Sequence, residues 1–144
     1  MTINTTPESV HSELATEVTL TFPAAPCHVR LARLVASGMA TQAGFGIDDI
    51  EDLRIGVDEM CSLLVDYVAT DSAGLEDDVI LRFRLDDGGL SVLAQVPRGI
   101  SHRTFAPDEL SLLILDAVVE DRRMDVTNSE VKVSFRKPLS ATPL

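Results

Sequence analysis

The chain has 144 residues, 45% of them apolar, and its 12 basic and 23 acidic side chains give a formal net charge of −11. This length fits one domain that can bury a core without disulfides or metals. Such an acidic chain would repel phosphates, which argues against a nucleic-acid-binding protein. The same charge suits a basic protein partner, or it simply keeps a domain in solution.

The first fifteen residues are polar, and we expect a flexible N-terminal segment over residues 1–15. Apolar residues alternate over Thr16–Phe22, which predicts a strand. Prolines then end this strand, and apolar residues at helical spacing predict a helix from Cys27 to Gln42. We expect its inward stripe to consist of aliphatic and sulfur-containing residues, namely Val29, Leu31, Leu34, Val35 and Met39.

A turn around Gly44 and Gly46 separates this helix from a second one. Asp48 and Asp49 supply capping oxygens and favourable negative charge at its start, and its apolar pattern continues to about Ala69. We expect its buried stripe to comprise Ile50, Leu53, Val57, Met60, Cys61, Leu64 and Val68.

Two strands, Val79–Leu85 and Leu90–Val96, flank an Asp-Asp-Gly-Gly sequence that predicts a hairpin turn. A third helix is predicted from Pro107 to near Asp121. We expect its inward side chains to be Leu110, Leu113, Ile114, Ala117 and Val118. Residues 124–127 and 131–136 then predict a closing hairpin.

This order of elements predicts an α/β (α+β) two-layer sandwich. Its sheet would be mixed and mainly antiparallel, with helices covering one face. We expect the folded domain to span residues 16–138, followed by a short C-terminal tail over residues 139–144.

Cys27 and Cys61 both lie in apolar helical contexts without CxxC spacing. This pattern favours small buried thiols in a reducing compartment, although the sequence leaves a disulfide between them open. No apolar run is long enough to cross a membrane, and the first residues lack a secretory signal pattern. We therefore expect a cytoplasmic protein without a membrane partner.

Residues 52–67 read DLRIGVDEMCSLLVDY, a helix that sets the carboxylate of Glu59 among apolar neighbours. This stretch resembles the N-box helix of the anti-sigma-factor serine kinases of the GHKL ATPase superfamily, whose pattern runs roughly D-L-R-L-A-V-D-E-A-C-T-N. Glu59 matches the family's glutamate. Leu63 stands at the metal-binding asparagine, and Tyr67 stands at the position of the histidine.

Two further segments support the resemblance. Residues 29–35 are similar to the family's first helix, and residues 110–119 are placed like its G-L-G-L-x-L segment. The likeness covers about residues 16–138 and implies the GHKL, or Bergerat, sandwich. It is most similar to the divergent actinobacterial branch, whose ATP boxes are degenerate.

The resemblance also locates departures in the nucleotide-binding boxes. Gln95 replaces the aspartate that contacts adenine, Pro97 replaces the first glycine of that box, and Glu109 falls in the second glycine box. Leu63 cannot ligate magnesium, and a carboxylate repels a triphosphate. We therefore expect no cofactor and no metal site, with ATP–Mg binding lost or weak.

The resemblance implies roles for three charged residues. Glu59 would be the general base of phosphoryl transfer, or else a helix carboxylate that pairs with Arg54 or faces solvent. Arg30 would belong to the surface shared by sigma factor and anti-anti-sigma protein, or else be an ordinary surface arginine. Arg33, one turn on, would join the same patch.

Two functions follow from the resemblance. The first is a pseudokinase-like anti-sigma factor that sequesters an alternative sigma factor and is released by an anti-anti-sigma (STAS-domain) protein in partner switching. The alternative is an ATP-dependent serine kinase that phosphorylates that antagonist. A homodimer is implied in both cases, and a regulator unrelated to sigma factors also stays open, since fold alone does not fix function.

Overall fold

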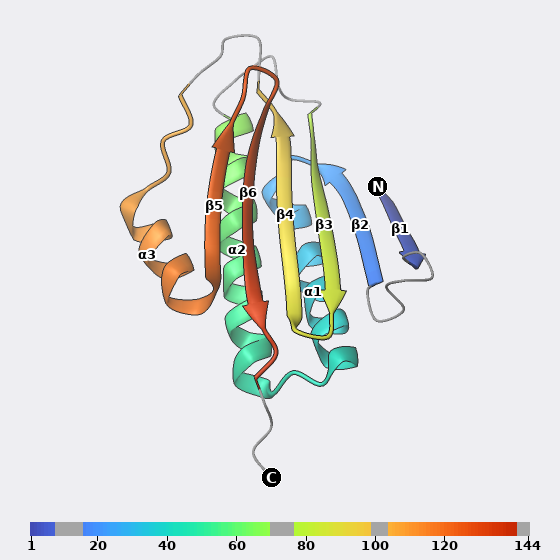
Figure 1. Ribbon diagram of the computed structural model, residues 1–144. Coiled ribbons are helices and arrows are strands. Elements are labelled where there is room, and N and C mark those ends of the chain that lie inside the picture. The colour runs from blue at the N-terminus through green and yellow to red at the C-terminus, as the bar shows by residue number, and fades with distance from the viewer. Residues whose placement is uncertain (8–15, 70–76, 99–103, 141–144) are drawn as a thin grey trace.

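A computed structural model describes residues 1–7, 16–69, 77–98 and 104–140 of the chain. These residues form two layers, a six-stranded sheet and helices on one of its faces (Figure 1). The strands are β1 (Thr2–Pro7), β2 (Thr16–Pro23), β3 (Asp78–Asp86), β4 (Gly89–Pro97), β5 (Glu120–Val126) and β6 (Glu130–Pro138). The helices are the short 3₁₀ turn η1 (Pro26–His28), α1 (Val29–Ala43), α2 (Ile47–Ala69) and α3 (Glu109–Val118).

The sheet has the strand order β1-β2-β3-β4-β6-β5, and each neighbouring pair is antiparallel. The α/β sandwich and its covered face are therefore confirmed, while the described sheet is wholly antiparallel rather than mixed. Side chains alternate between the two faces of each strand. On β4, for example, Leu90, Val92, Ala94 and Val96 are buried toward the helices. The intervening residues lie on the other face, which we call the open face.

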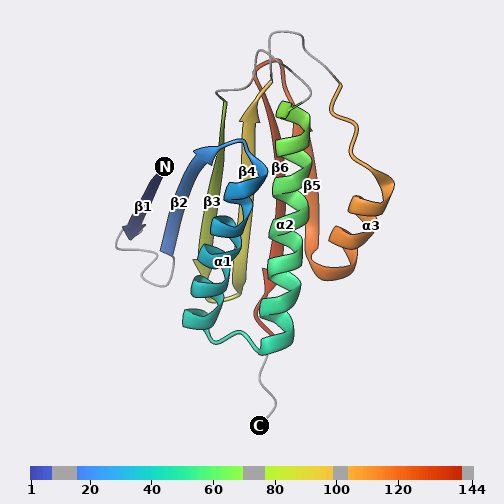
Figure 2. The ribbon, with the colours of Figure 1, turned by 180° about the vertical axis from the view of Figure 1, so that it is seen from behind.

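Helices α1 and α2 lie side by side across one face of the sheet, and α3 flanks α2 at the β5 edge (Figure 2). The core between the layers is apolar, and none of the described polar or charged residues is fully buried. Its largest fully buried side chains include Phe22, Phe83, Leu20, Leu53, Met60 and Leu64. Burial of such a continuous apolar layer is the main favourable term in the folding free energy.

Helix α1 buries a face made largely of small residues. Ala32, Ala36 and Ala40 are fully buried, whereas Leu34 is 65% exposed. The predicted inward stripe was therefore wrong for Leu34, and Leu31 and Val35 are only partly buried. Alanines at this spacing form one stripe along a helix and allow the helix axis to approach its neighbours closely.

Helix α2 confirms its predicted stripe, since six of those seven residues are buried and Ile50 packs partly buried against the core. The helix also buries Leu63, Val65 and Tyr67, which the stripe did not include. The wider burial follows from its central position, because the sheet and both neighbouring helices contact α2. A helix enclosed on several sides buries more than one stripe.

Helix α3 differs most from its prediction. It ends at Val118 rather than near Asp121. Leu115 is its one buried residue, while Leu110 and Leu113 are 62% and 67% exposed. The predicted inward set was therefore wrong for Leu110, Leu113 and Ala117, whereas Ile114 is half-buried and Val118 packs partly buried against the core. Helix α3 lies beside the edge strand β5 and α2 instead of across the sheet, so it buries only a narrow strip of its surface.

The N-terminus contains an unpredicted strand. Residues Thr2–Pro7 pair antiparallel with β2, which corrects the expectation of a flexible segment for this part of residues 1–15. Residues 8–15 and 141–144 lie outside the described residues, and the limits of the domain stay a prediction. Among the described residues, no helix is long and apolar enough to cross a membrane.

Both cysteines are unpaired thiols, and only one is buried. Cys61 is fully buried in α2, whereas Cys27 is exposed in η1, which corrects the expectation that both are core residues. The two residues therefore form no disulfide. Burial raises the pKa of the Cys61 thiol, and the nearby charge of Asp58 raises it further.

The β3–β4 turn confirms the predicted hairpin. The Asp86 carboxylate accepts hydrogen bonds from the backbone N–H groups of Gly88 and Gly89, at 2.8 and 3.0 Å. Arg136 of β6 donates two further bonds to this carboxylate, at 2.8 and 3.2 Å. Hydrogen bonding from Arg136 holds the pKa of Asp86 below its usual range, so the turn is tied to the sheet by a charge-assisted contact.

Two helical glycines give a matched test of the packing between the layers. A Cβ at Gly56 in α2 would lie 2.8 Å from Val119 Cγ1, whereas a Cβ at Gly38 in α1 would meet nothing within 4 Å. We expect Gly56→Ala to lower the free energy of unfolding by about 1–2 kcal/mol, because overpacking outweighs the gain in helix propensity. Gly38→Ala should raise it by about 0.5–1 kcal/mol. Urea denaturation measures both, and equal changes would contradict close packing at Gly56.

Candidate functional site

One face of α2 carries the residues on which the family resemblance rests. Glu59, Leu63 and Tyr67 are spaced four residues apart, so they follow one stripe of the helix. Leu63 and Tyr67 are buried, and Glu59 is partly buried. Arg54 donates to Glu51 at 3.3 Å instead of pairing with Glu59. Within the described chain, the Glu59 carboxylate therefore has no basic partner and can accept a hydrogen bond from an incoming group.

A hollow of about 330 Å³ lies where the end of α2 meets the segment before α3. It is lined by Leu63, Asp66, Tyr67, Thr104, Phe105, Ala106, Pro107, Asp108 and Ser111. The rings of Tyr67 and Phe105 meet edge to face, with centroids 5.7 Å apart and an interplanar angle of 85°. Such a pair stabilises the contact between α2 and the segment before α3.

This hollow does not fit a magnesium-bound triphosphate. Leu63 offers no oxygen to a metal, and Asp66 and Asp108 bring negative charge to the lining. The Asp108 side chain also accepts a hydrogen bond from the Leu110 N–H at 3.4 Å, so the N-terminus of α3 is capped by its own carboxylate. Helix N-termini that bind phosphate use these N–H groups for the ligand.

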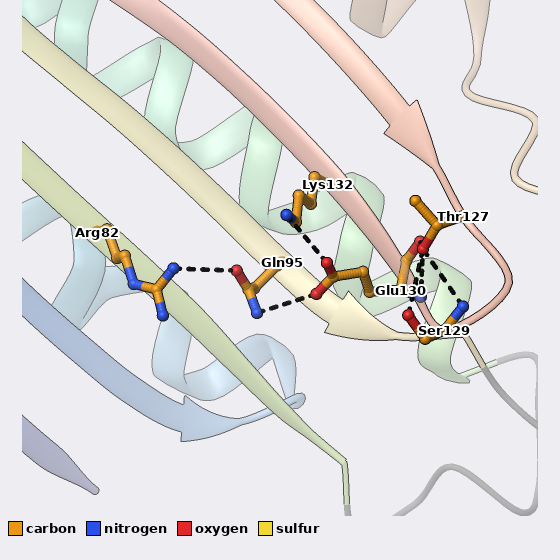
Figure 3. Close-up of polar contacts among 6 residues, drawn as sticks. All are labelled: Arg82, Gln95, Thr127, Ser129, Glu130 and Lys132. Atoms are coloured by element: carbon orange, nitrogen blue, oxygen red, sulfur yellow. Dashed lines mark hydrogen bonds and ion pairs between the residues drawn. The ribbon is translucent and has the colours of Figure 1, made fainter.

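Two residues of the expected adenine-binding box, Gln95 and Pro97, do not line this hollow. The alternation of β4 places Gln95 on the open face, away from the buried side where α2 packs. There its amide donates to Glu130 at 3.2 Å and accepts from Arg82 at 3.4 Å (Figure 3). Pro97 follows on the same face and is exposed. The structure therefore does not bring Gln95 and Pro97 together with Leu63, and Glu109 is exposed in the first turn of α3.

A second site forms on the outer side of α1. Arg30, Arg33, Leu34 and Ser37 of α1, with Arg54 of α2, line a hollow of about 380 Å³, and we call these five residues the α1 surface. The four α1 residues share one helix face because they are three, four and seven positions apart. The α1 surface thus sets an exposed leucine among three guanidinium groups.

The arginines of the α1 surface differ in how they are held. Arg33 Nε lies 3.6 Å from Asp58 Oδ1 of α2, and this buried N–H donates no hydrogen bond to any described residue. The ion pair orients Arg33 across the α1–α2 contact. Arg30 is exposed and forms no hydrogen bond or ion pair with another described residue. An exposed planar guanidinium next to an apolar side chain is suited to anchor a protein partner.

Sequence reasoning proposed Arg30 and Arg33 as partner-binding residues, and the structure adds Leu34 and Arg54 to the same hollow. The signal for Leu34 was the series of alanines Ala32, Ala36 and Ala40, which mark the buried face and so place Leu34 outward. Nothing in the local sequence indicates that Arg54 of α2 would meet α1, because this contact depends on how the two helices are packed.

Comparisons with known proteins agree with this fold. The family model described as "Histidine kinase-like ATPase domain" matches residues 22–132. The chain is 36% identical over 76 residues to the serine-protein kinase RsbW of Bacillus velezensis, covering 53% of this chain and 46% of that protein. It is 38% identical over 73 residues to the RsbW of Bacillus licheniformis, covering 49% and 44% of the two chains.

A solved structure shows the same fold. The RsbU and RsbW domains of a Mycobacterium tuberculosis protein match with a TM-score of 0.65 at 19% identity, over 88% of this chain and 33% of that one. The chain spans about half the length of the curated relatives that it matches.

The lining of the Leu63 hollow predicts the outcome of a nucleotide titration. We expect calorimetry with ATP and magnesium, and with a nonhydrolysable analogue, to show no saturable heat at about millimolar nucleotide, because the two carboxylates of the described lining repel phosphate and Leu63 replaces the oxygen ligand of the family's metal. Thermal melting should be unchanged in the same solutions. Saturable, magnesium-dependent binding would contradict this assignment of the hollow.

Proposed function

Because the chain belongs to the histidine kinase-like ATPase domain family, we propose that it is an anti-sigma factor that sequesters an alternative RNA polymerase sigma factor by protein binding. Its release would come from a competing anti-anti-sigma protein with a STAS domain. The similarity to proteins named serine-protein kinase RsbW supports this placement.

The observation that carries the proposal is the α1 surface. Arg30 and Leu34 are exposed side by side, with Arg33 and Arg54 completing a cationic rim. Interfaces often concentrate their binding energy in a few arginine or apolar anchors surrounded by polar groups. Burial of Leu34 against a bound partner would explain why this apolar side chain is exposed in the free chain.

The charge of the chain supports the same kind of partner. A net charge of −11 would attract a protein with basic DNA-binding faces and speed its approach, while the α1 surface would pair with carboxylates at the contact itself. We propose a cytoplasmic homodimer that acts as a pseudokinase, since the Leu63 hollow is poorly suited to ATP and magnesium.

Binding to a sigma factor tests the proposal directly. We expect one of the alternative sigma factors of the source organism, each purified and titrated by calorimetry, to bind the chain. Arg30→Glu and Leu34→Asp should each weaken that binding at least about tenfold, or about 1.4 kcal/mol, because both remove an anchor and add a repelling charge.

The control is Ile47→Asp at the start of α2. Ile47 is 85% exposed, so this variant makes the same change in charge and polarity as Leu34→Asp but outside the α1 surface. It should bind the sigma factor with unchanged affinity. Equal affinity of all four proteins would refute the assigned surface, and failure of every sigma factor to bind would refute the anti-sigma function.

The alternative function is that of a serine kinase acting on the anti-anti-sigma protein. It is favoured by the carboxylate of Glu59 and by the similarity to proteins named serine-protein kinase RsbW. In this case Glu59→Gln should abolish transfer of radiolabelled phosphate to the STAS protein, because the base is lost while the size of the side chain is kept. Asp48→Asn, exposed in the first turn of the same helix and outside the hollow, is the matched control. Normal transfer by the Glu59 variant would exclude Glu59 as the base.

A further inference from the structure

The open face of the sheet carries an unusual share of the positive charge of this acidic chain. Its outward positions on β3, β5 and β6 hold five of the 12 basic residues, which we call the basic face: Arg82, Arg84, Arg123, Lys132 and Arg136. Figure 1 looks onto this side of the sheet, and no described segment crosses it. The basic face is thus on the opposite side of the sheet from α1 and the α1 surface.

A shallow hollow lies in the middle of the basic face. Its volume is about 390 Å³, and its lining includes four arginines and two serines, Arg82, Arg84, Arg123, Arg136, Ser91 and Ser134. Glu17 and Asp121 also line it, so cations outnumber carboxylates by four to two there. The arginines of this hollow can therefore pair with an anionic group, although the chain as a whole is acidic.

The cations of the basic face differ in whether they pair with a carboxylate of the described chain. Arg136 is bound to Asp86, and Lys132 Nζ lies 2.9 Å from Glu130 Oε1 (Figure 3 shows the latter pair). Arg82, by contrast, donates only to the neutral amide of Gln95 at 3.4 Å. Arg123 forms no hydrogen bond or ion pair with any other residue that the structure describes. Two exposed guanidinium groups therefore lack a carboxylate partner within the described chain.

The strand register sets the spacing of these two groups. Arg82, Leu93, Ser134 and Arg123 stand in one cross-strand row on the open face, on β3, β4, β6 and β5. Three strand spacings of about 4.8 Å separate the backbones of Arg82 and Arg123 by about 14 Å. An extended chain laid along this row rises about 3.3 Å per residue, so carboxylates four residues apart would face both arginines.

We propose that the basic face binds an extended acidic segment of a partner protein, whose carboxylates pair with Arg82 and Arg123. Guanidinium groups bind carboxylates through two parallel hydrogen bonds, and Ser134 offers a further donor between Arg82 and Arg123. A sheet face open to solvent suits a polypeptide better than a small ligand, since small ligands are largely enclosed in their sites. This surface is separate from the one assigned to the sigma factor.

The test uses a fluorescein-labelled decaglutamate peptide and fluorescence anisotropy at low salt, with the full chain. We expect saturable binding that weakens as salt is raised. Arg82→Gln combined with Arg123→Gln should weaken it at least about tenfold, and Arg123→Gln alone by less. Circular dichroism melting should show that both proteins are folded, since these side chains are exposed.

Two matched variants locate the binding. Arg122, next in sequence to Arg123, is held by Asp116 of α3 at 2.6 and 3.0 Å, so Arg122→Gln removes the same charge outside the basic face. Arg30→Gln removes it from the α1 surface. Both should bind decaglutamate like the unchanged protein. A loss caused by Arg30→Gln, or an equal loss in all variants, would overturn the proposal.

The remaining outcomes are also decisive. Absence of saturable binding would mean that the basic face binds no acidic polypeptide. Complete displacement of decaglutamate by an equal concentration of inorganic pyrophosphate would mean that its ligand is a phosphate compound. Either result would overturn the proposal. If the double variant changes the sedimentation of the protein from dimer to monomer while decaglutamate binding stays the same, the basic face joins two copies of this chain and the proposal is wrong. Each of these outcomes is independent of sigma-factor binding.

Discussion

The close contact of α1 and α2 with a single face of the sheet is the constraint on which the other features depend. Small side chains at the contact, Ala32, Ala36 and Ala40 on α1 and Gly56 on α2, let backbones approach without voids. With its small residues facing inward, α1 turns its arginines and Leu34 outward. Because the helices cover only one face of the sheet, the strands place mainly polar side chains on the open face.

The position of Leu63 and Tyr67, where α2 meets the segment before α3, also explains the departures of this chain from the N-box pattern. The buried Tyr67 contacts Phe105, and the buried Leu63 stands where the family resemblance implies an oxygen ligand for a metal. These changes support one another physically, since an apolar wall next to capped N–H groups of α3 forms a stable junction without any ligand. Stability of this junction and affinity for a triphosphate make opposite demands on the same residues.

Much of the fold could be predicted from the sequence, because the strands alternate and α2 carries a regular apolar stripe. The β3–β4 hairpin was likewise marked by its Asp-Asp-Gly-Gly turn. The errors on α1 and α3 have a common cause, since large apolar residues were assumed to face inward. Leu34 faces outward because α1 buries a stripe of alanines instead. Leu110 faces outward because α3 lies at the edge of the sheet and buries only a narrow strip of its surface. Strand β1 was missed because a polar edge strand lacks apolar alternation and is specified by its partner β2.

The candidate site was predictable only in part. Arg30 was named from the resemblance of residues 29–35 to the family's first helix, and Arg33 was added as its neighbour one turn on. Their pairing with Leu34 needs only the correct rotation of α1. Arg54 and the row from Arg82 to Arg123 depend on which elements become neighbours in space, which local sequence does not specify. Gln95 shows the same limit, since one residue of register decides which side of the sheet it faces.

The two thiols give the molecule a built-in contrast in reactivity. The exposed sulfur of Cys27 is open to alkylating and oxidising reagents in the native state, whereas Cys61 lies at the centre of α2 with its ionisation suppressed by burial. Modification of Cys61 therefore requires the helix to separate from the sheet. Its labelling rate would report how often the two layers part, while Cys27 in the same molecule supplies the rate for an unhindered thiol.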